Sequence, residues 1–259
     1  MSILTREAAQ NWITRWDRQQ EGYLPDREER FTALIDAVEA GAGRSDPLVL
    51  DLGCGPGSLS SRLLDRLPGA TVVAIDADPL LLALGDAVNA GRPGLRFADH
   101  DLREPGWAAA LGLPRPADVA VSTTALHWLS PGDLRTMLAE LTSVLRPGGL
   151  FLNGDHMEAG DVAPRLGELE RAVHDRATAR RFGAGMPEDW RQWWDAAGAD
   201  PELAELCHAR ERRVAGADHH GSESLFLSTH VAALREAGFG EIGTLWQNGH
   251  NRLLGAIYG

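Results

Sequence analysis

The segment 49–57 constrains the fold of this chain most strongly. It reads Val-Leu-Asp-Leu-Gly-Cys-Gly-Pro-Gly, an apolar run that leads directly into Gly53, Gly55 and Gly57. Glycine at alternate positions permits a tight turn and lets a ligand approach the backbone closely. The N–H groups at the start of the helix that should follow attract a carboxylate or a phosphate. The segment therefore predicts a strand, a ligand-binding loop and a helix.

Two familiar phosphate-binding loops fit this segment poorly. The dinucleotide fingerprint requires a third glycine three places after the second, and position 58 is Ser. A P-loop requires Gly-Lys-Ser/Thr, which is absent here. The loop is thus expected to hold something other than a pyrophosphate.

Apolar runs of strand length alternate with segments of helical periodicity along the chain. This alternation is typical of parallel strands that helices bury on both faces. We expect strands at 48–52, 71–76, 95–98, 119–122, 150–153, 243–247 and 252–258, and helices at 58–67, 79–89, 131–145 and 229–237. The fold class is α/β, a doubly wound, mostly parallel, seven-stranded sheet of Rossmann-like type.

Two stretches fall outside this repeat and suggest the domain organisation. Residues 1–45 form an N-terminal helical segment, expected to pack across the mouth of the sheet. Residues 157–228 are expected to form a helical cap inserted after the fifth strand, which would bind the substrate. The core is then 46–156 and 229–259. Trp190, Trp193 and Trp194 have helical spacing, and we expect two of the three in the core of the cap.

Acidic residues at the predicted strand ends suggest a nucleoside ligand. Asp76 ends the second strand, and a carboxylate there can accept hydrogen bonds from both hydroxyls of a ribose. Asp101 follows the third strand, where a carboxylate and the next backbone N–H can read the amino edge of an adenine. Spacing favours Asp101 over Asp99, although either residue can also be a surface carboxylate or a helix N-cap.

These motifs together resemble the class I S-adenosylmethionine-dependent methyltransferases. The resemblance covers about 46–156 in order, including the strand 118–122 and Leu-Arg-Pro-Gly-Gly at 145–149, and a turn at 234–239. It implies S-adenosyl-L-methionine as the cofactor. It also implies a set of cofactor-binding residues: Gly53, Gly55 and Gly57 at the methionine part, Asp76 at the ribose, Asp101 and Leu102 at the adenine, and in addition Asp51, Ala77 and Ser122.

The segment after the fourth strand is expected to meet the acceptor. Its Leu-His-Trp at 126–128 is similar to carboxyl methyltransferases of the trans-aconitate and salicylate types, in which an indole N–H can hold an acceptor carboxylate. His127 is a candidate catalytic base, because an imidazole titrates near neutral pH. Trp128 is a candidate acceptor-binding residue. A packed histidine and a tryptophan buried beneath the cap are the alternatives.

Further candidates lie at the edge where doubly wound folds bind ligands. Asp155 can face the acceptor and His156 can act as a second base, but both positions also fit exposed loop residues. The stretch Asp-His-His-Gly-Ser-Glu at 218–223 offers His220 to the acceptor, with an ordinary polar loop as the alternative. No third ligand can be placed by spacing, so no metal is expected.

Composition narrows the class of partner. With 25 Lys+Arg and 37 Asp+Glu, the net charge of −12 disfavours binding to nucleic acid. No apolar run approaches the roughly 18 residues that span a membrane, and the start lacks a secretory apolar segment. We expect a cytoplasmic monomer or homodimer. Cys54 and Cys207 show no zinc or disulfide pattern and are expected to be buried thiols.

The sequence thus predicts methyl transfer to a small-molecule acceptor, with O-methylation preferred and a carboxylate acceptor slightly favoured. A methyl group on a sulfonium is reactive, so the protein mainly needs to align the acceptor and exclude water. N- or C-methylation of a metabolite is an alternative. A nicotinamide-dependent oxidoreductase and a non-catalytic cofactor-binding protein are more distant ones.

Overall fold

The computed structural model describes residues 4–183, 185–214 and 225–259. Within them one sheet has the order β3-β2-β1-β4-β5-β7-β6, with β7 antiparallel to both of its neighbours and β1 to β5 mutually parallel. The strands are β1 (Leu48–Leu52), β2 (Thr71–Asp76), β3 (Leu95–Asp99), β4 (Ala117–Thr123), β5 (Leu145–His156), β6 (Phe239–Asn248) and β7 (Asn251–Tyr258). The predicted doubly wound, mostly parallel sheet is confirmed.

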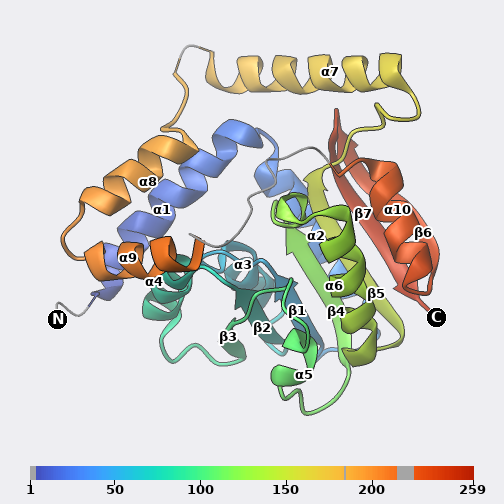
Figure 1. Cartoon of the computed structure of the whole chain (residues 1–259), viewed down its shortest axis with the longest axis horizontal. Coiled ribbons are helices and arrows are strands. Elements are labelled where there is room, and N and C mark those ends of the chain that lie inside the picture. Colours follow the sequence, from blue (N-terminus) through green and yellow to red (C-terminus); the bar gives the residue numbers. More distant parts are fainter. Residues whose placement is uncertain (1–3, 184, 215–224) are drawn as a thin grey trace.

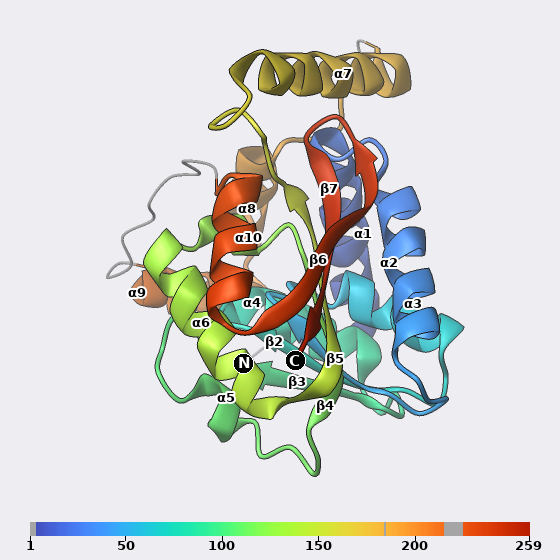
Figure 2. The ribbon, with the colours of Figure 1, turned by 90° about the vertical axis from the view of Figure 1, so that its right-hand side faces the viewer.

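Helices cover both faces of this sheet (Figures 1 and 2). They are α1 (Arg6–Tyr23), α2 (Arg27–Gly41), α3 (Ser58–Arg66), α4 (Pro79–Asn89), α5 (Trp107–Ala110), α6 (Pro131–Val144), α7 (Pro164–Phe182), α8 (Trp190–Ala199), α9 (Ala204–Val214) and α10 (Leu227–Glu236), with a 3₁₀ turn, η1, at Leu126–Trp128.

The residues of β1 explain why the sheet lies at the centre of the molecule. All five are buried. Leu48, Leu50 and Leu52 pack in one cluster with residues of α6 and α10, whereas Val49 packs in a second cluster with residues of α2 and α3. Because alternate side chains point to opposite faces, a strand without polar alternation must be covered twice.

The two helices of the N-terminal segment pack against different parts of the structure. α2 packs Phe31, Leu34 and Val38 against one face of the sheet. α1 lies over the glycine loop, where a Cβ at Gly55 would be 3.8 Å from the ring of Trp16. The prediction that the whole segment crosses the mouth of the sheet is therefore wrong for α2, whose apolar stripe matches the sheet face instead.

Helices α7, α8 and α9 lie between β5 and α10 in the sequence. α7 crosses one end of the β6–β7 hairpin (Figure 1), where Glu170 forms a buried ion pair with Arg252. The polar stretch 218–223, including His220, lies outside the described residues.

The tryptophans join α8 to α1. Trp193 is fully buried, and its ring meets those of Trp12, Trp16 and Trp194 edge-on, with centroids 4.9–5.4 Å apart. Trp194 packs against the same cluster, whereas Trp190 stays 38% exposed. The expectation of two tryptophans in a core of the cap holds only for Trp193, and the core that it joins is shared with α1 and α4.

None of the helices in the described residues is long and apolar enough to cross a membrane.

Truncating Trp193 tests the joint between α8 and α1. We expect Trp193→Ala to lower the free energy of unfolding by about 3–5 kcal/mol, since it removes a fully buried indole. Trp190→Ala, the matched control on the same helix, should cost under about 1 kcal/mol. Urea unfolding followed by circular dichroism measures both, and equal losses would contradict the assignment.

Candidate functional site

The glycine loop after β1 takes a conformation that requires glycine. Gly53, Gly55 and Gly57 have φ values of 71°, 54° and 79°, in the left-handed region. The N–H groups of Gly53 and Cys54 both donate to the carbonyl of Ile75, at 2.8 and 2.9 Å. A Cβ at Gly53 would overlap with the Cβ of Ala125 in the segment after β4. The loop is thus tied to the end of β2 and lies against the β4 turn.

Asp76 stands where the loop meets β2. Its Oδ2 accepts from the N–H of Gly55 at 2.7 Å, and its Oδ1 accepts from the N–H of Asp78 at 2.9 Å. Burial raises the pKa of Asp76 to about 6, although these backbone donors oppose the rise. Each carboxylate oxygen can accept more than one hydrogen bond, so Asp76 can still receive a pair of ligand hydroxyls.

Two further predicted cofactor residues lie deeper in the sheet. Asp51 is fully buried; Ser60 Oγ donates to its Oδ2 at 2.6 Å, and its Oδ1 has no hydrogen-bond partner among the described residues. Burial raises the pKa of Asp51 to about 7. Ser122 is also buried and donates to the carbonyl of Leu52 at 2.8 Å, so its hydroxyl joins β4 to β1.

The acidic residues around the end of β3 are paired with arginines. Asp101 forms a salt bridge with Arg103 at 2.6 Å, and Asp99 forms one with Arg213 of α9 at 2.7 Å. Leu102 is buried in the core beneath α6. Neither carboxylate is free of charge partners, and the role of Asp101 and Leu102 at an adenine stays a prediction.

Helix α9 reaches over the ends of β2 and β3 through two arginines. Arg213 donates to the carbonyl of Ala77 at 2.7 Å, and Arg210 pairs with Asp78 at 2.7 Å. The guanidinium of Arg210 also stacks 3.7 Å from the centre of the Trp194 ring. The helices after β5 are therefore fastened next to Asp76.

A histidine in the turn after β4 pairs with an aspartate near the end of β5. Asp155 is fully buried; it lies 2.8 Å from Nδ1 of His127 and accepts from the backbone N–H groups of His127, at 3.2 Å, and His156, at 2.8 Å. Burial disfavours the charge on each partner, but their attraction outweighs it: the pKa of Asp155 is lowered and that of His127 is raised.

The position of Asp155 rules out one of the interpretations that the sequence allowed. Asp155 and His156 are not exposed loop residues, because β5 continues to His156 and pairs with the start of β7. The strand expected at 150–153 is longer in the structure and extends to His156. Its end is hard to predict, because an aspartate in a sequence gives no sign that it lies buried in a strand. Its burial is compensated by an ion pair that the sequence cannot place.

His156 lies at the edge of a separate cavity of about 350 Å³. The cavity is lined by residues of α1, β5 and α7 and of the segment after α7, among them Tyr23, His156, His174, Thr178 and Met186. The rings of His156, His174 and His250 lie within 4.6–5.4 Å of one another. Burial lowers the pKa of His156 to about 3, so its imidazole is neutral and a weak base.

A larger cavity of about 800 Å³ adjoins the glycine loop at Pro56 and Gly57. It is bounded by α1, α3 and α4, and Asp17, Ser58, Arg62 and Arg92 are among its lining residues. Several of these side chains already pair with each other, as in Arg62 with Asp17 at 3.2 Å. Since Asp76 and His127 do not line it, we assign it no part in the site.

Trp128 and Arg30 complete the surroundings of His127. Trp128 is 46% exposed, so its ring is not buried beneath the cap, and its centroid lies 5.0 Å from that of His127. Arg30 of α2 is fully buried and donates to Thr123 Oγ1 at the end of β4 at 2.7 Å. Arg30 could not be recognised as a buried residue from the sequence, because within Arg-Glu-Glu-Arg-Phe it resembles an ordinary charged residue on the exposed face of a helix.

The expectation of two buried thiols holds for Cys54 but not for Cys207. Cys54 is buried, Cys207 is half-buried, and both are free thiols. In the described ranges no group of three or more His, Cys, Asp and Glu side chains has an arrangement that could hold a metal ion.

Comparison with known proteins agrees with this geometry. Residues 49–149 match the model of a methyltransferase domain. Trans-aconitate 2-methyltransferase from Azoarcus sp. (strain BH72) is 35% identical over 136 residues, or 52% of this chain and 49% of the relative. The enzyme of that name from Deinococcus radiodurans is 37% identical over 166 residues, or 62% and 54%. The chain thus spans about half the length of these relatives.

A solved structure shows the same fold over nearly the whole chain. The magnesium protoporphyrin IX methyltransferase from Synechocystis PCC 6803, with bound SAH, superposes with a TM-score of 0.56 and covers 95% of this chain and 94% of its own, at 16% identity. At that identity the likeness concerns the fold alone.

A methyl group at position 53 tests the fit of the glycine loop against the β4 turn. Gly91 is the matched control, since its φ of 75° is also left-handed but a Cβ there meets nothing within 4 Å. We expect Gly91→Ala to lower the free energy of unfolding by about 1 kcal/mol through backbone strain alone. Gly53→Ala should cost about 1–3 kcal/mol more through overpacking. Thermal unfolding compares them, and similar losses would refute the close contact.

Proposed function

We propose that this chain, which belongs to the class I S-adenosylmethionine-dependent methyltransferases, transfers the methyl group to a carboxylate of a small-molecule acceptor. The proposal rests on one observation above all: the pair of His127, in the turn after β4 that adjoins the glycine loop, and Asp155 of β5. The donor side and the acceptor side of the reaction would then meet where Ala125 touches Gly53.

The residues around the glycine loop fit S-adenosylmethionine. The three left-handed glycines leave room for a ligand against the backbone, and Asp76 retains lone pairs for two ribose hydroxyls. The unpartnered, buried Oδ1 of Asp51 is an acceptor that the ammonium group of a methionine tail would satisfy. When bound, the cofactor supplies a methyl group on a positively charged sulfur.

His127 is suited to hold an anionic acceptor. Asp155 occupies Nδ1 of its imidazole at 2.8 Å and leaves the Nε2 side of the ring for a ligand. Because the pKa of His127 is raised, the ring keeps its proton to higher pH than an ordinary histidine. An N–H donor on a charged ring binds carboxylate strongly, and this binding fixes one oxygen while the other faces the methyl group.

The chain does not need to take a proton from such an acceptor. A carboxylate is ionised at neutral pH, so alignment and exclusion of water are the remaining tasks. We assign alignment to His127 and Trp128, and the covering of the site to α1, α8 and α9. The names of the relatives, trans-aconitate 2-methyltransferases, support an acid as the acceptor.

A hydroxyl acceptor is the second candidate, and the same pair favours it in a different way. A carboxylate that orients an imidazole through Nδ1 is also the arrangement of a general base. His127 would then act as the neutral ring and receive the proton of the hydroxyl.

The pH dependence of turnover separates the two candidates. For an acid acceptor, with the cofactor saturating and the pH above 6 so that Asp76 is ionised, kcat/KM should fall as the pH rises through the raised pKa of His127, because the ring loses its charge. Asp155→Asn should move this fall to lower pH, since it removes the charge that raises that pKa. Assays with tricarboxylic and aromatic acids measure it. A rate that instead rises with pH, on a hydroxyl acceptor, would overturn the carboxylate assignment.

Cofactor binding should depend on the charge of Asp76. Because its pKa is about 6, the carboxylate is protonated below that pH, and affinity should fall as the pH drops through 6. Asp76→Ala should weaken binding about tenfold or more at pH 8, from the loss of about 1.5–3 kcal/mol in charged hydrogen bonds. Calorimetric titration with S-adenosylhomocysteine tests both; unchanged affinity would reject the ribose assignment.

A further inference from the structure

The backbone is strained at the point where β4 ends. Thr124 has a φ of 52°, the one positive φ at a residue other than glycine in the ranges 4–183, 185–214 and 225–259. A β-branched side chain in the left-handed region is unfavourable, and such conformations persist only where the surroundings impose them. Thr124 begins the turn that leads to His127 and Trp128, so whatever holds Thr124 also sets the course of that turn.

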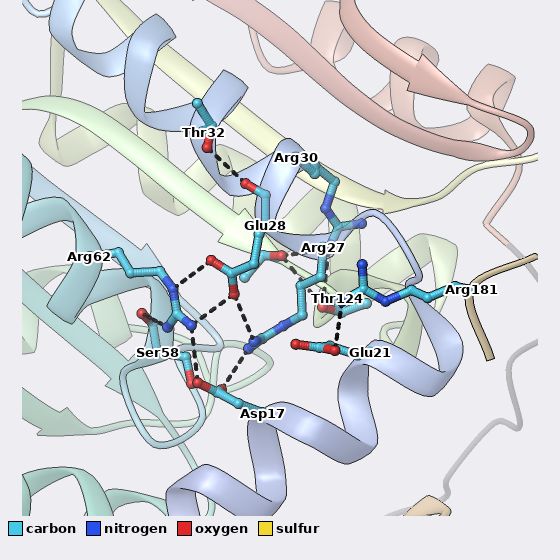
Figure 3. A network of polar contacts seen from close by, with 11 residues as sticks. Asp17, Glu21, Arg27, Glu28, Arg30, Thr32, Ser58, Arg62, Thr124 and Arg181 are labelled. Carbon is cyan, nitrogen blue, oxygen red and sulfur yellow. Dashed lines mark hydrogen bonds and ion pairs between the residues drawn. The ribbon is translucent and has the colours of Figure 1, made fainter. Parts of the chain in front are cut away.

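Three contacts hold Thr124 in place. Its N–H donates to the carbonyl of Gly154 at 2.8 Å, and its Oγ1 accepts from Nη2 of Arg30 at 3.3 Å and lies 3.4 Å from Oγ1 of Thr123. The same Nη2 donates to Thr123 Oγ1, while Nη1 donates to Asn251 Oδ1 at 2.6 Å. Figure 3 shows Arg30 extending from α2 toward Thr124. A single guanidinium therefore connects α2, the end of β4 and the start of β7.

The sheet makes room for this guanidinium. A Cβ at Gly154 would lie 2.9 Å from Nε of Arg30, and Gly154 does not need glycine for its own backbone conformation. Arg30 is fully buried, and across the described residues it forms no salt bridge. Burial lowers its pKa to about 10, which still leaves the charge in place at neutral pH.

A buried arginine is an unfavourable choice if its only function is to connect α2 to the sheet. Burying a cation that no carboxylate contacts directly costs free energy, which the attraction of the nearby Asp155 offsets only in part, and an apolar side chain of similar length would join α2 to the sheet without that cost. What an apolar side chain cannot do is donate to the threonine hydroxyls that fix the turn. The arrangement thus favours a role in shaping the turn over a role in stability alone.

We propose that Arg30 is a positioning residue, which holds Thr124 in its left-handed conformation and so directs His127 onto Asp155. The inference rests on the proposed function, in which His127 meets the acceptor. Arg30 itself touches neither reactant; it acts through the turn.

The direction in which the pKa of His127 changes when Arg30 is removed distinguishes a positioning role from a purely electrostatic one. Asp155, Arg30 and His230 are the titratable or charged groups that act on its ring. If Arg30 acted by charge alone, removing it would raise the pKa of His127, since one cation would no longer repel another. If Arg30 holds the turn, removing it separates His127 from Asp155, and the pKa falls toward the ordinary value.

The test uses the full chain with Arg30→Gln, Arg30→Lys, Thr124→Gly and the double variant Arg30→Gln/Thr124→Gly. NMR titration of the His127 ring should give a lower pKa in Arg30→Gln and a smaller fall in Arg30→Lys. The double variant should recover most of the loss, because glycine adopts a left-handed conformation unaided. Where an acid acceptor is turned over, kcat/KM should fall at least tenfold in Arg30→Gln and recover likewise, with cofactor affinity changed less than twofold.

Arg27→Gln is the matched control, a buried arginine of the same helix that pairs with Asp17 at 3.0 Å. It should lower stability and leave the His127 titration unchanged. A raised or unchanged pKa in Arg30→Gln, or no recovery in the double variant, overturns the positioning role. The titration requires no turnover, so it tests the role of Arg30 even if the carboxylate assignment fails. If the unmodified protein turns over an acid but the pKa of His127 is the same in Arg30→Gln, the positioning role alone is rejected.

Discussion

The reversal of strand order between β1 and β4 is the constraint on which the site depends. From β1 the chain moves outward to β2 and β3, and then returns to the other side of β1 to form β4 and β5. Loops that follow neighbouring strands on either side of this point diverge and leave a crevice at the carboxyl edge. The glycine loop and the β4 turn face each other there, and the overlap of any Cβ at Gly53 with Ala125 shows how closely they approach.

Local sequence patterns predicted most of the sheet and the glycine loop. β1 and β2 have the predicted bounds, because their apolar runs are continuous and end in glycine or aspartate. The glycine loop could be recognised from three residues at alternate positions, whose left-handed backbone is a local property. The course of α2 was misjudged, since periodicity indicates that a helix has an apolar face but not which surface that face meets.

The acceptor side was harder to predict because its contacts link distant residues. Asp155 pairs with His127, 28 positions away, and Arg30 bonds with Thr123 and Asn251, 93 and 221 positions away. A buried charge resembles a surface charge until its partner is known. The same applies to Asp99, whose partner Arg213 lies on α9.

Gly154 has an implication for how sequences of this kind can change. Among the described residues, the atoms nearest to a Cβ at Gly154 all belong to Arg30, so a larger residue at 154 and the loss of arginine at 30 relieve each other. Two positions more than a hundred residues apart should therefore vary together among descendants of this chain: glycine at one accompanies arginine at the other. Pairs that break this correlation would mark lineages in which the segment after β4 has found another course.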